Sequence, residues 1–441
     1  MRRRDFLSAA AITVATTGLS VELAGPAAAS PPPSRGWNGT VATGFDVLAA
    51  DGYRLLHGQR VGMISNPTAV TRDLTHEVDV MHRSDGVHLV AVFGPEHGFR
   101  GTAQAGGSEG FFTDPATGLP VYSLYGAGIS ATVDTFSDAG VDVVVFDIQD
   151  VGTRFYTYIW TMYRSMAAAA IMGLPFVVLD RPNPLGGRAA TGPVLHPEFS
   201  SGVGVKAIAQ QHGMTVGELA QLFNDQFLPA DAGGKRADLK VVPMRGWRRG
   251  QYFDRTGVPW VMPSPNMPTL DTALVYPGFG MFEGTNFAEG RGTTRPFELI
   301  GAPYCDFQLR DALAAQRLPG AGFRENYFVP TFSKYSAPAS TVAGVQVYVT
   351  DRDSFDPIRT AVAVMVTARQ LYPDDWSFDG YAIDGGPGFQ PDWVDYLSGS
   401  TWIRTSVEAG RSTDEIAAGW QDELAQFATL RETFLIYRKE S

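Results

Sequence analysis

The sequence predicts a mixed α/β protein built on a Rossmann-like, mostly parallel sheet. From about Trp37, short apolar runs typical of buried strands alternate with helix-like segments, and this alternation favours parallel strands joined by helices. Three of the apolar runs also end directly in ionisable side chains. Open α/β sheets build their functional sites at the carboxyl ends of parallel strands. The same pattern therefore predicts where the site lies.

The helices and strands expected before Pro259 are predicted from the spacing of apolar residues and from the turn residues between them. Strands are expected at 60–66, 88–93, 141–146 and 176–179. Helices are expected at 73–82, around 134–139 and at 157–172, the last ended by Gly173. A further helix is expected from Thr215, with Glu218 three residues later completing a capping box. A polar break at 230–236 precedes a strand at 239–243.

The amino-acid composition of the chain changes after Pro259. Proline, glycine and aromatic residues crowd 260–303, and so long a loop-rich stretch is typical of a functional segment. Beyond it we expect helices at 307–318, 355–371 and 413–427, and strands at 342–350 and 433–437. The chain is thus predicted to contain a Rossmann-like domain at 37–258 and a smaller α/β domain at 259–441.

The first residues resemble an export signal. Paired arginines precede an Ala/Thr/Val-rich stretch that ends at Ala29, which predicts a twin-arginine signal peptide at 1–29. A merely basic start is the alternative. The prolines at 31–33 predict a stiff linker at 30–36. No later run is long and apolar enough to span a bilayer, so no membrane association is expected after signal removal.

Composition excludes several classes of function. The 441 residues carry a formal net charge of −11, which argues against a nucleic-acid partner. The single cysteine, Cys305, is expected to be an apolar filler. Neither a zinc pattern among the seven histidines nor a dinucleotide-binding glycine motif is present. We therefore expect no metal and no cofactor.

The most informative segment is 89–101, where a strand-like run meets Gly94 and Pro95 and then Glu96, His97 and Arg100. A glutamate at a strand end beside glycines suits a general acid. The alternative is a structural ion pair between Glu96 and Arg100. His97 could orient Glu96 or could donate to a backbone carbonyl.

Two further strand ends carry charge. The candidates after the third strand are Asp147, Gln149, Asp150, Arg154, Tyr156 and Tyr158. Asp147 lies in an apolar run, so it must be hydrogen-bonded or functional. Tyrosines beside hydrogen-bonding side chains suit sugars, although an aromatic core stripe is the alternative. Asp180 and Arg181 follow the fourth strand in a proline-fixed turn, either in the site or as an internal ion pair.

A fourth segment, 282–297, concentrates charge among glycines. It holds Glu283, Glu289, Arg291 and Arg295 together with Asn286. Arginine forks bind carboxylates bidentately, so Arg291 or Arg295 could recognise an acid on a ligand. One rival motif, Gly-x-Ser-x-Gly around Ser108, lacks the preceding strand of a serine-hydrolase elbow.

These four segments, together with 122–126, 212–220 and 259–268, resemble one family in the same order: the exo-β-N-acetylmuramidases of the NamZ type, formerly a domain of unknown function. The resemblance covers 44–437. It implies an active-site cleft between the two domains, with Glu96 as general acid and an acidic motif at Glu283 and Glu289. It places Asn266 among the substrate-binding candidates. Residues 205–211, which precede the His-Gly-Met-Thr segment, depart from the sequence usual in the family, and this puts the leaving-group preference in doubt.

The resemblance implies an exported glycosidase that releases N-acetylmuramic acid from the non-reducing end of peptidoglycan fragments. Glycoside cleavage needs a carboxylic acid and usually a second carboxylate, or an acetamido group oriented by an aspartate such as Asp147 or Asp150. The residues leave these routes open. A non-catalytic protein that binds muropeptides is the alternative function. Export would place either protein in the cell wall, the periplasm or the extracellular space.

Overall fold

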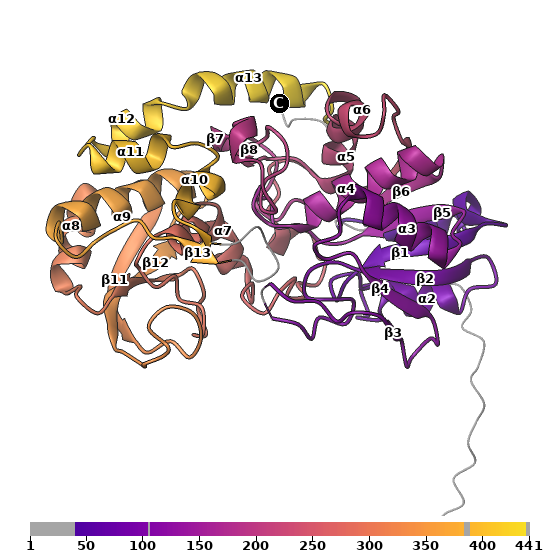
Figure 1. Ribbon diagram of the computed structural model, residues 1–441, viewed down its shortest axis with the longest axis horizontal. Coiled ribbons are helices and arrows are strands. Elements are labelled where there is room, and N and C mark those ends of the chain that lie inside the picture. Colours follow the sequence, from indigo (N-terminus) through magenta and orange to yellow (C-terminus); the bar gives the residue numbers. More distant parts are fainter. Residues whose placement is uncertain (1–39, 105, 383–388, 438–441) are drawn as a thin grey trace, which may run out of the picture. The chain divides into compact units, whose positions relative to one another are not determined.

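The computed structural model describes residues 40–104, 106–382 and 389–437, which belong to one compact unit, Trp37–Ser441 (Figure 1). The predicted signal peptide at 1–29 and the linker at 30–36 lie outside the described residues. None of the described helices is long and apolar enough to cross a membrane.

A seven-stranded sheet forms the first part of the fold, in the order β3-β4-β2-β1-β5-β6-β9. Every pairing in it is parallel except that of β3 with β4. The predicted mostly parallel sheet is therefore confirmed. Its strands are β1 (Arg60–Ser65), β2 (His88–Gly94), β3 (Phe112–Thr113), β4 (Pro120–Ser123), β5 (Val143–Asp147), β6 (Pro175–Leu179) and β9 (Asp238–Val242).

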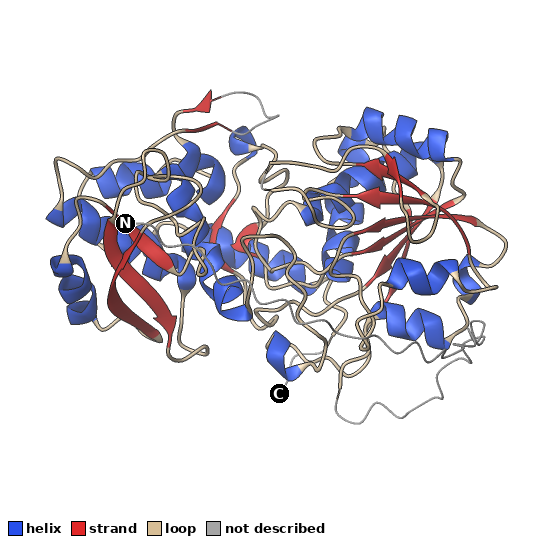
Figure 2. Ribbon diagram, turned by 90° about the horizontal axis from the view of Figure 1, so that it is seen from below, coloured by secondary structure: helices blue, strands red, loops and turns tan. Residues whose placement is uncertain are grey.

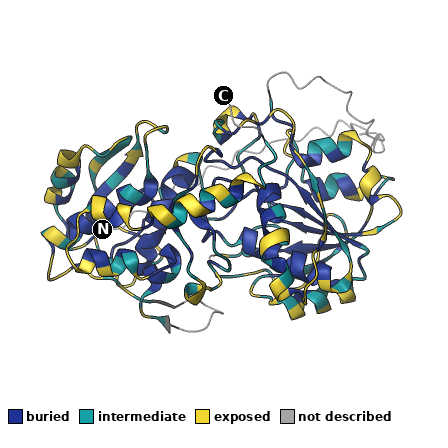
Figure 3. Ribbon diagram, turned by 90° about the horizontal axis from the view of Figure 1, so that it is seen from above, coloured by how far each residue is buried: buried dark blue, intermediate teal, exposed yellow. Residues whose placement is uncertain are grey.

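Helices cover both faces of this sheet (Figure 2). Val143 and Val145 of β5 pack with α1 (Gly44–Ala50) and α2 (Glu77–His82) on one face. Val144 and Phe146 face the other way, toward α3 (Ile129–Ala139), α4 (Tyr158–Met172) and α5 (Val216–Gln226). Because successive side chains of a strand alternate between faces, a fully apolar strand implies helices on both sides. The central strands are accordingly buried (Figure 3).

The second part is built on a three-stranded antiparallel sheet in the order β10-β12-β11. Helices α7 and α9 pack on each other, and α8 packs on α9, β11 and β12. The remaining helices and strands are β7 (Thr191–Val194), β8 (Ala209–Gln211), α6 (Leu228–Asp231), α7 (Leu270–Phe279), β10 (Leu299–Ala302), α8 (Phe307–Gln316), β11 (Ala321–Phe328), β12 (Val342–Val349), α9 (Pro357–Leu371), β13 (Tyr381–Ala382), β14 (Phe389–Gln390), α10 (Trp393–Ser398), α11 (Trp402–Glu408), α12 (Thr413–Ala418) and α13 (Gln421–Glu432).

Several predicted elements differ from the structure. The strand expected at 433–437 is wrong, because the amides of Ile436 and Tyr437 bond to the Glu218 side chain instead of to another strand. The helix expected at 413–427 is divided at Gly419, which packs so closely on Trp402 that a Cβ there would lie 2.2 Å from the ring. The loop expected at 260–303 contains α7 and β10. The helix expected at 73–82 begins only at Glu77.

Candidate active site

Three strand ends meet at the point where the strand order of the large sheet reverses. β1 lies between β2 and β5 and is parallel to both. The chain leaves β1 toward β2 and β4 on one side and returns to β5 on the other side, so the strand order reverses at β1. In open α/β sheets this reversal opens a crevice at the carboxyl ends of the strands. Asn66 follows β1, Glu96 follows β2 and Asp150 follows β5. The fold thus brings together two of the segments that the sequence singled out, those of Glu96 and Asp150, beside Asn66.

A tight turn after β2 presents Glu96. His97 adopts a left-handed backbone (φ 70°), which is unfavourable for a side chain with a Cβ and is found mainly where the surroundings impose it. Gly98 (φ +85°) cannot be replaced easily, because a Cβ there would lie 2.3 Å from the Glu109 carboxyl group. Glu109 in turn accepts hydrogen bonds from the amides of Arg100 and Thr102 and so closes the loop beside the turn.

The Glu96 carboxylate accepts two hydrogen bonds from uncharged groups. The Gly106 amide donates to Oε1 at 2.9 Å, and the Thr157 hydroxyl donates to Oε2 at 2.6 Å. Glu96 is partly exposed, whereas residues 91–95 and 97–99 are buried. A partly exposed carboxyl group held on both oxygens has the access and the fixed orientation that acid catalysis needs.

The alternatives for the neighbouring charges are settled by their contacts. Arg100 pairs with Asp114 at 2.8 Å and with Asp79 at 3.1 Å, so Glu96 is not its partner. The His97 ring places Nδ1 3.0 Å from the carbonyl oxygen of Ala103. This contact matches the expectation that His97 serves the backbone and does not orient Glu96.

Three buried tyrosines form an aromatic wall beside Glu96. The ring centroid of Tyr156 lies 5.0 Å from that of Tyr158 and 5.8 Å from that of Tyr276 on α7. The Tyr158 hydroxyl donates to the carbonyl of Pro263, which joins α4 to the 259–268 segment. Burial raises the pKa of Tyr276 well above its ordinary value, and the charges of Glu283, Glu96 and Asp150 raise it further. The Tyr276 hydroxyl is therefore influenced electrostatically by three of the predicted carboxylates.

Asp150 is held by a histidine. Its Oδ2 lies 3.2 Å from His212 Nε2 and also accepts the Gly152 amide at 2.7 Å. His212 Nδ1 accepts the Met214 amide, so Nε2 carries the proton and donates to Asp150. Oδ1 of Asp150 is buried without a hydrogen-bond partner within the described chain.

Glu283 and Arg291 form a second charged group near Tyr276. Their side chains are 10% and 11% exposed and join at 2.6 Å. Burial raises the pKa of Glu283, while Arg291 opposes that shift. The Trp393 indole of α10 donates to Glu283 at 3.4 Å. This pair retains some access to solvent.

Glu289 is more enclosed. Ser333 donates to its Oε1 at 2.7 Å and Lys334 lies 3.6 Å from its Oε2. Burial would raise the pKa of Glu289, but Lys334, Arg291 and Ser333 outweigh burial and lower it. Lys334 also donates to three backbone carbonyls, those of Phe282, Glu283 and Phe287. These contacts give Glu289 a structural role, and its predicted catalytic role stays a prediction.

Asp147 takes part in a buried ion triad. Arg181 donates to Asp147 and, at 2.8 Å, to Glu77, and all three side chains are at most 2% exposed. Burial raises the pKa of Glu77 well above its ordinary value, and Arg181 opposes that shift. Asp147 and Arg181 therefore hold α2 against the strand ends. Arg181 forms an internal ion pair, as the alternative expected, but with Asp147 and Glu77 and not with Asp180.

The remaining candidates make mostly backbone contacts. Arg154 is fully buried and donates to the carbonyls of Pro193, Ile208 and Leu397; burial lowers its pKa to about 9. Gln149 donates to two carbonyls, those of Asp150 and Pro182. Asn286 bonds to the 375–377 segment and Tyr304. Arg295 pairs with Glu298 at 3.1 Å. Asn266 is partly exposed in the 259–268 segment.

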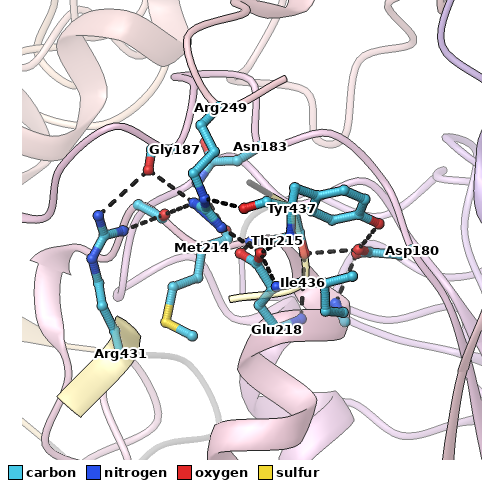
Figure 4. Close-up of polar contacts among 12 residues, drawn as sticks. Asp180, Asn183, Gly187, Met214, Thr215, Glu218, Arg249, Arg431, Ile436 and Tyr437 are labelled. Atoms are coloured by element: carbon cyan, nitrogen blue, oxygen red, sulfur yellow. Dashed lines mark hydrogen bonds and ion pairs between the residues drawn. The ribbon is translucent and has the colours of Figure 1, made fainter. Parts of the chain in front are cut away.

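Asp180 belongs to a network that holds the end of the described chain (Figure 4). Its carboxylate accepts from Thr215, Gly217 and Tyr437. The predicted capping box of Thr215 and Glu218 is confirmed, and Glu218 also pairs with Arg249. These contacts account for Asp180 without a ligand, and its contact with substrate stays a prediction.

The described residues offer no cluster of metal ligands, and a sizeable hollow among them lies away from the candidate site residues. No group of three or more His, Cys, Asp or Glu side chains there could hold a metal ion. A hollow of about 360 Å³ is lined by residues of α5 and β9, Arg236 and Phe434, and none of the candidate site residues lines it.

Three residues that contact the predicted carboxylates are not indicated by the sequence: Thr157, Tyr276 and Lys334. The sequence predicts Thr157 only as the start of a helix, and its contact with Glu96 spans 61 positions. Tyr276 lies one residue before Pro277, inside a stretch that the sequence predicts to be a loop. No signal in a single sequence indicates such contacts.

Comparisons with known proteins agree on one family. A family model described as exo-beta-N-acetylmuramidase NamZ, N-terminal, matches residues 61–271, and its C-terminal counterpart matches residues 274–437. The peptidoglycan beta-N-acetylmuramidase NamZ of Bacillus subtilis is 48% identical over 90% of this chain and 91% of its own length.

Two solved structures, both of DUF1343 family proteins from Bacteroides fragilis, have the same fold. One has a TM-score of 0.79 at 33% identity and covers 91% of this chain and all of its own. The other has a TM-score of 0.68 at 28% identity and covers 91% of this chain and 99% of its own.

Proposed function

The chain belongs to the exo-β-N-acetylmuramidase NamZ family and is a glycosidase, and we propose that it releases N-acetylmuramic acid from the non-reducing end of peptidoglycan fragments with Glu96 as general acid. The observation that carries this proposal is the state of Glu96. Its carboxyl group is partly exposed at the reversal point of the sheet and is held by two uncharged donors. Among the described residues it has no ion-pair partner, which would stabilise the carboxylate form and oppose proton transfer.

In the proposed reaction, the proton on Glu96 passes to the glycosidic oxygen while the bond from that oxygen to C1 of the muramic acid breaks. The positive charge that develops at C1 needs a second negative or nucleophilic group. Asp150 and Glu283 are the candidates, because the charges of both, like that of Glu96, raise the pKa of the Tyr276 hydroxyl. The acetamido group of the substrate, oriented by Asp150, is the substrate-assisted alternative.

The experiment uses two matched glycan fragments. The purified protein is incubated with a disaccharide whose non-reducing end is N-acetylmuramic acid, and with one whose non-reducing end is N-acetylglucosamine, and products are identified by mass spectrometry. We expect N-acetylmuramic acid from the first fragment, no product from the second, and no product from Glu96→Gln. Binding of both fragments without cleavage would overturn the proposal in favour of a non-catalytic cell-wall protein.

Export by the twin-arginine pathway is part of the proposal, because both substrates and products of the reaction lie outside the cytoplasm. The paired arginines before an apolar stretch support it. Residues 1–36 fused to a reporter are expected to export it, and replacing Arg3 and Arg4 by lysine is expected to stop export. Retention of the reporter by the unmodified segment would contradict this part.

A further inference from the structure

The two hydrogen bonds to Glu96 are of different kinds. The Gly106 amide can only donate, so Oε1 is always an acceptor. The Thr157 hydroxyl can donate or accept, so Oε2 can exist either with or without a proton. The geometry therefore distinguishes the two oxygens and leaves Oε2 as the one that can carry the proton.

Thr157 is held rigidly enough to define a position. It precedes α4, of whose fifteen residues twelve are buried. Its carbonyl accepts the amides of Trp160 at 3.0 Å and Thr161 at 3.1 Å. Among residues 151–160, all of them described, only Thr157 is partly exposed. It therefore reaches the same open side as Glu96 from a fixed helix.

The hydroxyl of Thr157 is not used for the helix that it begins. At other helix starts, Thr43, Thr215 and Thr269 have extended backbones and accept an amide of their own helix. Thr157 has a helical backbone (φ −70°, ψ −12°) and caps nothing, as does Thr401 before α11. The Thr157 hydroxyl is therefore available to donate to Glu96.

We propose that Thr157 is a positioning residue for acid catalysis, which fixes Oε2 of Glu96 and stabilises the carboxylate that forms there. This inference rests on the proposed function. When the O–H bond of Glu96 breaks and the proton joins the glycosidic oxygen, negative charge develops on the Glu96 carboxylate. Hydrogen bonds to an anion are about twice as strong as those between neutral groups, so the Thr157 hydroxyl binds the transition state more tightly than the ground state.

The test compares Thr157→Val, which has the same shape without the hydroxyl, with Thr157→Ser, which retains it. We expect kcat/KM of Thr157→Val on an alkyl or sugar leaving group to fall about 10- to 100-fold, as for the loss of a hydrogen bond to a charged group. The alkaline limb of its pH–rate profile is expected to move to higher pH, because the carboxylate loses a donor. Thr157→Ser is expected to restore both.

A leaving group that needs no proton provides the internal control. On a 2,4-dinitrophenyl β-N-acetylmuramide, Thr157→Val is expected to be nearly as active as the wild type. Thr161→Val makes the same chemical change one turn along α4 and is expected to leave rate, pH profile and leaving-group dependence unchanged. If Thr157→Val does not fold, Thr157→Ala is compared with Thr157→Ser by the same readouts.

The outcomes separate the two proposals. Loss of activity in Glu96→Gln with a wild-type rate and pH profile in Thr157→Val would overturn the role of Thr157 alone. An equal loss on both leaving groups with an unshifted pH profile would also overturn it, because that is the effect of a purely structural residue. Full activity of Glu96→Gln would overturn the proposed function itself.

Discussion

The buried ion triad of Arg181, Asp147 and Glu77 shows that a buried charge needs a compensating partner. Arg181 compensates Asp147 and Glu77 where none of the three side chains is more than 2% exposed. We predict that Arg181→Met lowers the free energy of unfolding by about 3–5 kcal/mol, because it leaves an uncompensated buried charge. Glu77→Gln is expected to cost less than Arg181→Met, because burial already disfavours the charged form of Glu77 and raises its pKa, and the amide has nearly the same shape.

Urea unfolding at pH 7 compares the two variants with the wild type. Equal losses would contradict a raised pKa at Glu77. A negligible loss in Arg181→Met would contradict a structural role for Arg181 and would return it to the substrate-binding candidates.

Arg291 is the arginine expected to recognise the carboxylate that distinguishes N-acetylmuramic acid from N-acetylglucosamine. It is paired with Glu283 near Tyr276, while Arg295 is 44% exposed and paired with Glu298. We predict that Arg291→Met reduces the preference in kcat/KM for an aryl β-N-acetylmuramide over the matching glucosaminide by about 10- to 100-fold, as for a lost charge-assisted hydrogen bond. Arg295→Met is the matched control and is expected to leave the ratio unchanged; a greater effect at Arg295 would contradict the assignment.

At the scale of residues, the sequence predicts which strand ends carry chemistry, but it does not predict how each charge is paired. Glu96, Asp150 and Glu283 are predicted from strand ends and glycine-rich context, and the charges of all three raise the pKa of Tyr276. Arg154 and Arg181 have the same residue type and a similar local context, yet they contact backbone carbonyls or internal carboxylates. Whether an arginine faces a ligand or the core depends on contacts between distant segments, which a single sequence does not contain.

The helix α2 depends on a histidine. His76 caps it by accepting the Val78 amide on Nδ1, and its Nε2 donates to the Asn66 carbonyl at 3.0 Å. The contact through Nδ1 requires the neutral ring, because a protonated Nδ1 cannot accept. Burial, with the charge of Arg100, lowers the pKa of His76 to about 4, against an ordinary value of 6.5. Because the folded pKa is depressed, the contribution of His76 to stability is complete above pH 6.5 and is lost as the pH falls toward 4.

We predict that this residue accounts for about 2 kcal/mol of the free energy of unfolding lost between pH 7 and pH 5. His76→Asn retains a capping oxygen and does not titrate, so its loss over the same range should be smaller by that amount. Urea unfolding at the two pH values measures the difference. Parallel pH dependences in the two proteins would contradict the prediction.

At the scale of elements, periodic segments were predicted well and irregular ones were not. Five strands of the large sheet (β1, β2, β5, β6 and β9) and helix α4 lie within two residues of their predicted bounds, whereas the short strands β3 and β4 are not predicted. α7 was missed because Pro277 lies inside it and helices usually exclude proline. The segment 433–437 has the apolar pattern of a strand, but its amides are satisfied by a carboxylate. Local pattern decides an element only where no distant side chain competes for its backbone.

Over the whole molecule, the last described residues tie the second part of the chain to the first. α13 passes from α12 toward α5 (Figure 1), and Arg431 at its end donates to the carbonyls of Gly213 and Arg188. Tyr437 donates to Asp180, and Glu218 accepts the Ile436 amide (Figure 4). A chain ending at Thr433 is predicted to lose at least about 3 kcal/mol of unfolding free energy, because it removes the hydrogen bonds that Ile436 and Tyr437 donate to the buried carboxylates of Glu218 and Asp180.

Thermal and urea unfolding of the shortened chain test this prediction, with Tyr437→Phe as a graded control that removes one hydroxyl only. The control is expected to lose about 1–3 kcal/mol. Equal stability of all three proteins would show that the described end of the chain does not hold the two parts together.

The central claim is that Glu96 gives a proton to the departing oxygen, and the dependence of rate on the leaving group tests it most directly. The measurement is kcat/KM of the wild type and of Glu96→Gln on a series of aryl β-N-acetylmuramides with increasingly acidic phenols. We predict that the variant is severely impaired on poor leaving groups and approaches the wild type on dinitrophenol, because that phenolate departs without a proton. A uniform loss across the series, or none, would contradict the assignment of Glu96 as the acid.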